Sequence, residues 1–264
     1  MLRNQSILGL VFGHFWTICN SQIMMYTNQA LRNCALARTT FPSFLDFLAP
    51  STMRLNHVRH NSTTTSSPQK KPIYQLSQRQ REFLDSALRV NQAGELAATL
   101  IYDVQKPPVV RSHPHLRPLM KHMYDQEAGH FSTFNKYIAK HQVRPTAMYP
   151  VWEVAASVLG WSTAVMGREA AMACTEAVET EIGSHYNEQV REILSWAAEA
   201  ERRGEELDDE LKEMVATFRR IRDEELEHLD HAVENDSKEA KPYDPLINVI
   251  RAGCRAAINV SERV

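Results

Sequence analysis

Apolar residues recur at steps of three and four along four stretches of the chain, near residues 77–105, 112–141, from 150 onward, and 205–235. Side chains at this spacing lie on one face of an α-helix, so each stretch predicts a helix with one buried stripe. The third stretch is expected to break near Gly167, and a further helix is expected over about residues 243–260. The pattern predicts an all-α fold in which four helices bury their stripes against one another.

Carboxylates and imidazoles interrupt these apolar stripes on the same helix faces. On the second and fourth stripes they form two copies of Glu-x-x-His, within "DQEAGH" (residues 125–130) and "DEELEH" (residues 223–228). The first and third stripes carry a single glutamate each. The interrupting residues are Glu95, Glu127, His130, Glu179, Glu225 and His228. Because the four stripes meet inside the bundle, these six side chains are expected to gather in its core.

Buried glutamates need a compensating positive charge, because an unpartnered buried carboxylate would sooner bind a proton than stay ionised. Two divalent ions carry four positive charges, which match four glutamates, while two neutral imidazoles complete the shell. Ferritin-like bundles that bind two iron or manganese ions use one Glu from each of two helices and Glu-x-x-His from each of the others. The sequence therefore predicts a ferritin-like four-helix bundle, with additional amphipathic and C-terminal helices, around two metal ions. A plain bundle, with these residues as solvated charges or buried ion pairs, is the alternative.

The polar neighbours of the six residues have separate expected roles. Glu176, one helical turn from Glu179, is an alternative ligand. Asp125 and Asp223 are expected to accept hydrogen bonds from the outer ring nitrogens of the two site histidines. Oxygen-rich ligands with two imidazoles and no thiolate favour iron or manganese over copper or zinc. Three further histidines are expected at the surface or in the core rather than as ligands: His122, His185 and His231.

The net charge of -2 hides an uneven distribution. Residues 1–72 hold seven Lys or Arg and one acidic residue, Asp46, and end in a Ser/Thr-rich run. This composition predicts a mitochondrial transit peptide and disordered leader over residues 1–72, with the folded domain over 73–264. A secretory signal, or a merely disordered tail, is the alternative.

Several classes of protein are not supported by the sequence. The acidic remainder has no basic stripe, so binding to nucleic acid is not expected. The longest apolar run, residues 7–19, is shorter than the roughly 18 residues typical of a membrane-spanning helix. No Gly-x-Gly-x-x-Gly or P-loop is present, and Cys174 and Cys254 are expected to pack in the core.

Several long blocks of the chain resemble the mitochondrial demethoxyubiquinone hydroxylases, the monooxygenases of ubiquinone biosynthesis. They include "LRVNQAGELAA", "MYDQEAGHFSTFN", "GREAAMACTEAVETEIGSHYNEQ", "FRRIRDEELEHLDHA" and "AGCRAAINVSERV", and the resemblance covers about residues 84–264. The family usually has Asp-His where this chain has Asn91 and Gln92, and the segment around residues 195–213 is longer than expected. Neither departure removes one of the six residues.

The resemblance implies a ferritin-like fold and a centre of two iron ions held by the six residues. It implies hydroxylation, with dioxygen, of the ring of a polyprenylated demethoxyubiquinol, with reducing equivalents traced ultimately to NADH. It also implies a peripheral protein on the matrix side of the mitochondrial inner membrane and a lipid-binding partner protein. Tyr186 and Arg255 fall in matching blocks and are expected near the substrate.

The stretch over residues 148–166 carries one charge, Glu153, and is apolar on more than one face. Such a helix either lies against a membrane, with Trp152 and Trp161 as anchors, or is buried against the bundle and the C-terminal helix. The functional alternatives are an iron-storage or ferroxidase bundle, a radical-generating subunit with Tyr186 as its redox residue, and a non-enzymatic scaffold or regulator of the ubiquinone-synthesis complex.

Overall fold

Helices account for most of residues 71–264, the part of the chain that the computed structural model describes. Two short 3-10 helices, η1 (Pro114–Leu116) and η2 (Ser237–Glu239), precede the second and the last of the described α-helices. The α-helices are α2 (Gln78–Ser112), α3 (Arg117–His141), α4 (Tyr149–Met166), α5 (Arg168–Arg202), α6 (Asp209–Glu234) and α7 (Tyr243–Ser261). The predicted all-α fold is confirmed for these residues. The predicted leader, residues 1–72, lies almost wholly outside them.

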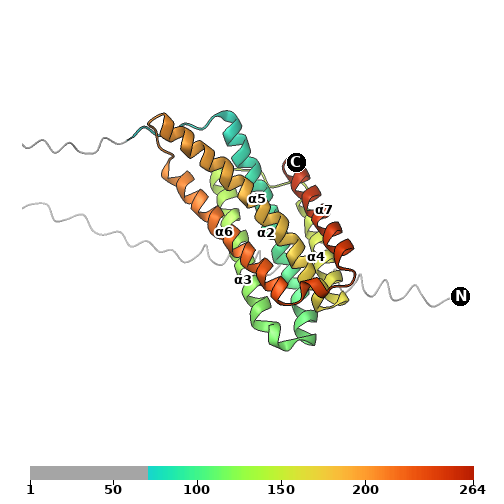
Figure 1. Cartoon of the computed structure of the whole chain (residues 1–264). Helices are drawn as coiled ribbons and strands as arrows, with labels where there is room; N and C mark the ends of the chain where they lie inside the picture. Colours follow the sequence, from blue (N-terminus) through green and yellow to red (C-terminus); the bar gives the residue numbers. More distant parts are fainter. Residues whose placement is uncertain (1–70) are drawn as a thin grey trace, which may run out of the picture. The chain divides into compact units, whose positions relative to one another are not determined.

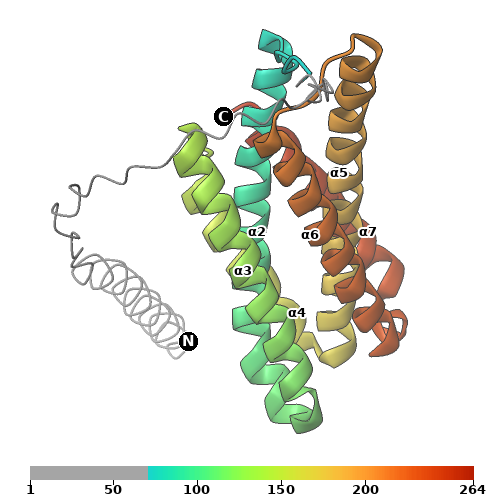
Figure 2. The same cartoon turned by 90° about the vertical axis from the view of Figure 1, so that its left-hand side faces the viewer.

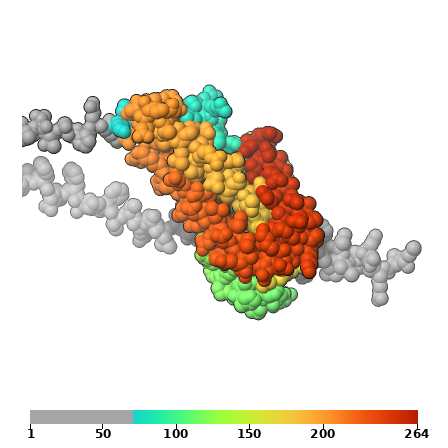
Figure 3. Space-filling view, viewed as in Figure 1, coloured from blue at the N-terminus to red at the C-terminus, as the bar shows by residue number. Residues whose placement is uncertain are grey.

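Two helix pairs form the core of the bundle. α2 packs against α3, and α5 packs against α6, and the four helices run side by side (Figure 2). α4 packs mainly against α2, and α7 packs against α5 (Figure 1). This is the ferritin-like four-helix arrangement with two added helices, as the apolar pattern predicted. In the face shown in Figure 3, α7 (red) lies directly beside α5.

Local signals set the helix ends close to their expected positions. Ser77 and Gln80 form a reciprocal capping box at the start of α2, and the Asp208 side chain caps α6. Gly167 separates α4 from α5 with φ of 123°, a conformation that a side chain with Cβ rarely adopts. The break predicted near this glycine is confirmed.

The end of α2 departs from the prediction. The helix continues through Pro107 and Pro108 to Ser112, whereas the prolines were expected to end it at residue 105. Each proline removes one backbone donor from the helix. Val109 and Val110, which directly follow the prolines, are buried with Leu116 in the core, and burial of each valine contributes about 1.5–3 kcal/mol. This packing offsets the lost hydrogen bonds. As a consequence, α3 begins at Arg117, after η1, rather than near residue 112.

The core lies on both sides of the glutamate positions. One apolar cluster contains Phe134, Phe218 and Ile193, and a second contains Met120, Met123 and Met172. Along α3, for example, Glu127 falls between Met123 of one cluster and Phe134 of the other. The polar positions are therefore held in a layer between two tightly packed apolar regions, which exclude water from it.

α4 has one face buried against the bundle, as one of its two predicted environments requires, and one face exposed. Its buried face includes Gly160, where an added Cβ would lie 2.6 Å from the Val104 side chain, so α4 approaches α2 closely. Its outer face exposes apolar side chains: Val151, Val154, Val158, Trp161, Val165 and Met166. Within residues 71–264, no helix has both the length and the apolar character needed to cross a bilayer.

Candidate metal centre

The structure brings together the six carboxylate and imidazole residues, each from its expected stripe. α2 contributes Glu95, α3 Glu127 and His130, α5 Glu179, and α6 Glu225 and His228. None of the six is more than 2% exposed. Their ligand atoms form two groups, each compact enough to surround one ion: Glu95, Glu127, His130 and Glu225, and Glu127, Glu179, Glu225 and His228. Glu127 and Glu225 belong to both groups, so they lie where two ions would share ligands.

The two Glu-x-x-His motifs interlock. Nδ1 of His130 on α3 lies 3.0 Å from Oε1 of Glu225 on α6. Nδ1 of His228 on α6 lies 2.9 Å from Oε1 of Glu127 on α3. Each histidine therefore faces the glutamate of the other motif, and the two motifs form one site rather than two separate ones.

The outer nitrogens of the histidines have partners that the sequence analysis did not identify. Nε2 of His130 lies 2.6 Å from Oε2 of Glu224, and Nε2 of His228 lies 2.9 Å from Oε1 of Gln126. The roles expected for Asp125 and Asp223 are wrong, because those side chains pair with Lys121 and Arg222 at the surface. Gln126 and Glu224 each directly precede a site glutamate, and this shared position could have identified them as the partners of the histidines.

These outer contacts fix the ring orientation. Glu224 and Gln126 accept hydrogen bonds, so in a neutral ring the N–H lies on Nε2 and the lone pair of Nδ1 points into the cluster. Inside the cluster, eight buried atoms have no hydrogen-bond partner: Nδ1 of both histidines, both oxygens of Glu127 and Glu225, and Oε2 of Glu95 and Glu179. Buried atoms of this kind are costly unless something cationic satisfies them. The residues fit two divalent ions.

Charge in the cluster is unbalanced on its own. Burial raises the pKa of Glu127 and Glu179 well above the usual range, and the charge of Glu225 adds to the effect. Burial also raises the pKa of Glu225, but the imidazoles outweigh it and lower that pKa to about 2. Burial lowers the pKa of His130, while Glu225 and Glu95 raise it to about 12. The carboxylates thus draw in positive charge, which either protons or metal ions can supply.

Two tyrosines hold the unshared glutamates. The Tyr102 hydroxyl on α2 donates to Oε1 of Glu179, at 2.9 Å, and the Tyr186 hydroxyl on α5 donates to Oε1 of Glu95. Both tyrosines are about 1% exposed. Each bond occupies one carboxylate oxygen and leaves the other directed into the cluster. Tyr102 was not singled out from the sequence, although its spacing from Glu95 equals that of Tyr186 from Glu179.

Two other residues lie outside the cluster. Glu176 accepts hydrogen bonds from Ser237, at 2.6 Å, and from Tyr243, at 2.8 Å, and forms an ion pair with Lys238. It therefore anchors the segment before α7 instead of replacing Glu179. Arg255 on α7 lies 2.7 Å from Oε1 of Glu181, so its side chain joins α7 to α5.

An apolar cavity of about 370 Å³ leads to one side of the cluster. Helices α2, α4, α5 and α7 line it, with Trp152 and Leu159 from α4 and Cys254 from α7. Glu95 and Tyr186 are also part of its wall. The cavity therefore places an apolar environment beside the cluster at its Glu95 end.

An all-α bundle with a buried cluster of four glutamates and two histidines has the fold and the residue set of the class of carboxylate-rich metal-binding bundles. Within that class the comparisons are specific, because residues 82–261 match the family described as "Ubiquinone biosynthesis protein COQ7". The chain belongs to this family.

Curated relatives extend the match over most of the chain. The chain is 44% identical to "5-demethoxyubiquinone hydroxylase, mitochondrial" of Saccharomyces cerevisiae, over 76% of this chain and 87% of that protein. It is 39% identical to the human "NADPH-dependent 3-demethoxyubiquinone 3-hydroxylase, mitochondrial", over 70% of this chain and 79% of that protein. It is 42% identical to "3-demethoxyubiquinol 3-hydroxylase" of Rhodospirillum rubrum, over 69% of this chain and 78% of that protein.

Proposed function

We propose that this chain is a di-iron monooxygenase that hydroxylates the ring of a polyprenylated demethoxyubiquinol with dioxygen, in ubiquinone biosynthesis. The observation that carries the proposal is the apolar cavity whose wall includes Glu95 and Tyr186. A quinol ring at that end would lie beside the metal-binding residues, while its tail would extend between α4 and α7. The names of the relatives, which are hydroxylases of demethoxyubiquinone or demethoxyubiquinol, support the same reaction.

The six clustered residues would hold two iron ions, with Glu127 and Glu225 shared between them. Iron bound there would supply the activation of dioxygen. The surrounding apolar layers exclude water, and Tyr186 and Tyr102 hold the unshared glutamates in position. Tyr186 also contacts the cavity, so it would position the ring, whereas Arg255 would act on the substrate only indirectly, through the contact of α7 with α5.

The reaction needs an electron donor. One oxygen atom of dioxygen is inserted into a ring C–H bond to give the hydroxyl group, and the other leaves as water, which consumes two electrons and two protons. NADH is the donor expected from the family resemblance, while relatives carry the name "NADPH-dependent". The assay therefore compares both nicotinamide cofactors.

The test uses the full chain, purified without oxygen and loaded with iron. It is incubated with a demethoxyubiquinol, ¹⁸O-labelled dioxygen, and NADH or NADPH, and the mass of the product is measured by mass spectrometry. We expect one labelled oxygen in the ring product and none with Glu225→Ala. A folded, iron-loaded chain that gives no labelled product with either donor would reject the hydroxylase and favour a scaffold or iron-binding role.

The chain is further proposed to work as a peripheral protein on the matrix side of the mitochondrial inner membrane, after loss of a transit peptide within residues 1–72. Support comes from the outer face of α4, which lies next to the cavity and on which five apolar side chains are more than half exposed: Val154, Val158, Trp161, Val165 and Met166. A lipid-binding partner protein would dock on the same face.

Binding of the full chain to liposomes of inner-membrane composition tests this surface. Val158→Glu should reduce co-sedimentation with liposomes without lowering the melting temperature, because Val158 is 52% exposed. Val233→Glu, on the exposed side of α6, is the matched control and should leave binding unchanged. Equal binding by both variants would show that α4 is not the membrane contact.

A further inference from the structure

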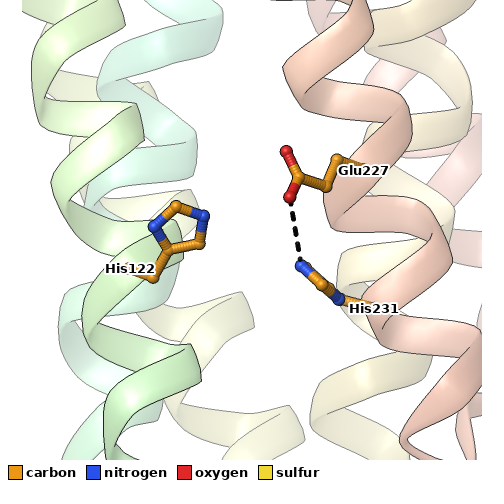
Figure 4. A group of neighbouring side chains, drawn as sticks. All are labelled: His122, Glu227 and His231. Atoms are coloured by element: carbon orange, nitrogen blue, oxygen red, sulfur yellow. Dashed lines mark ion pairs between the residues drawn. The ribbon is translucent and has the colours of Figure 1, made fainter.

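A second group of potential metal ligands lies at the surface, separate from the buried cluster. His122 comes from α3, and Glu227 and His231 come from α6. One ligand atom from each lies within 4.8 Å of the others. Figure 4 shows His122 directed from α3 toward the Glu227–His231 pair on α6. The group shares no residue with the buried cluster, and His122 and Glu227 are exposed.

The helix geometry explains why the three side chains meet. Glu227 and His231 are four residues apart, so they lie on one face of α6, and Nε2 of His231 is 3.5 Å from Oε1 of Glu227. A Glu–His pair at this spacing is common on helix surfaces. The third donor, arriving from a different helix, is what turns the pair into a potential three-ligand site.

Two further features favour a cation at this position. Nδ1 of His231 lies 3.6 Å from Oε2 of Glu234, so a carboxylate stands on the outer side of the ring, as it commonly does behind a metal-binding imidazole. Within residues 71–264, Glu227 forms no ion pair with a lysine or arginine. Its charge is therefore available to an ion.

We propose that His122, Glu227 and His231 bind one divalent transition-metal ion of the borderline class, such as Zn²⁺ or Co²⁺. Two imidazole nitrogens and one carboxylate oxygen suit these ions better than Mg²⁺ or Ca²⁺, which prefer oxygen ligands throughout. With three protein ligands, the fourth position stays open to water or to an external ligand.

A bound ion would join α3 to α6 close to the buried cluster. His122 is one helical turn before Gln126, which contacts His228, and Glu227 directly precedes His228. Ligands from two helices are brought together only in the folded chain, so the ion should raise the melting temperature as its concentration increases.

The experiment measures Zn²⁺ binding to the full, iron-loaded chain by calorimetry, with Co²⁺ absorption in the visible region as a second readout. The parent should bind about one equivalent of Zn²⁺ beyond the buried centre, and this equivalent should be lost in both His122→Ala and His231→Ala. Glu227→Gln, which keeps the side-chain shape, should weaken it. His115→Ala, which removes another exposed histidine, should leave it unchanged.

Iron content is measured in parallel, so that the outcome does not depend on the buried centre. Glu225→Ala, which disrupts that centre, should keep the surface equivalent. Equal Zn²⁺ binding by the parent, His122→Ala and His231→Ala would mean adventitious surface binding only and would overturn the proposal. Failure of the parent to bind any extra equivalent would overturn it as well.

Discussion

The pair α2/α3 and the pair α5/α6 carry the same set of residues, with the same spacing inside each corresponding helix. In each pair, the first helix has a glutamate followed seven positions later by a tyrosine: Glu95 with Tyr102, and Glu179 with Tyr186. The second helix has Glu-x-x-His. Each tyrosine donates to the glutamate of the opposite pair, so neither half is complete alone. The symmetry produces one cluster with two overlapping groups of potential ligands.

The two halves differ in what surrounds these shared residues. A carboxylate, Glu224, lies behind His130, while an amide, Gln126, lies behind His228. The apolar cavity reaches Glu95 and Tyr186 but not Glu179 or Tyr102. The repeated residues therefore define where ions would bind, and the unequal neighbours define the side from which a substrate would approach.

The largest expected effect comes from removing a shared glutamate. Glu127→Ala or Glu225→Ala should reduce bound iron from about two ions per chain to nearly none, because each belongs to both ligand groups. Glu95→Ala or Glu179→Ala should leave about one ion, since each belongs to one group. Elemental analysis of the anaerobically purified full chain measures the iron.

The comparison of iron content between variants is more informative than the iron lost by any one variant. The two shared glutamates should behave alike, and so should the two unshared ones. An unshared variant that loses both ions would contradict the division of the cluster into two overlapping groups, provided that circular dichroism shows the variant to be folded.

The second prediction exploits two glycines that directly precede cluster residues. Gly94 lines the cavity, while Gly129 on α3 is exposed, and an added Cβ meets no atom within 4 Å at either site. Gly94→Leu should fill the inner cavity and lower kcat/KM by about a hundredfold, with iron content unchanged. Gly129→Leu is the control. Because leucine favours helix more than glycine, it should only raise stability, by up to about 1 kcal/mol.

A comparison of these two variants tests the one-sided approach of the substrate. Steady-state kinetics with a demethoxyubiquinol gives kcat/KM for each variant, and urea unfolding gives its stability. If Gly94→Leu retained full activity, the cavity would not be the substrate path.

Much of the fold could be predicted from spacing alone, because buried faces of helices repeat at a known period. The helices around the cluster, the break at Gly167 and the grouping of six polar positions on facing stripes all follow from local patterns. The continuation of α2 through Pro107 and Pro108 could not be predicted from local patterns. Proline locally favours the end of a helix, but packing of the following valines against η1 and α3 offsets this preference.

The surroundings of the cluster were harder to predict. Asp125 and Gln126 are neighbours in sequence but point in different directions, and only the rotation of α3 relative to α6 decides which one reaches His228. The cavity depends on four helices that are distant along the chain. Periodicity gives the face of a helix, whereas these contacts depend on how far two helices are turned and shifted against each other.

The third prediction concerns the unequal partners of the histidines. Glu224→Gln removes the outer carboxylate of His130 and makes the two halves alike, and it should weaken metal binding about 10- to 100-fold. The expected cause is a less basic and less firmly oriented imidazole. A competition titration of the metal-free full chain against a chelating dye measures the affinity of the two ions.

Glu213→Gln, on the exposed side of α6, controls for the loss of one negative charge and should leave the affinity unchanged. Gln126→Glu tests the converse and should strengthen binding by the group that contains His228. Equal affinities in all three variants would show that the outer partners only fill space.

The smallest effect is expected from substitution of the two tyrosines. Each donates a hydrogen bond to a buried glutamate, but only one of them lines the cavity. Tyr102→Phe and Tyr186→Phe each leave one buried glutamate oxygen without its donor, which should cost about 1–3 kcal/mol of unfolding free energy in urea. The two losses should be similar, because both hydroxyls are buried against a carboxylate. Only Tyr186→Phe should also raise KM for the quinol, since Tyr186 lines the cavity and Tyr102 does not. Equal KM values would place the quinol away from the Glu95 side, even if the stability losses agreed.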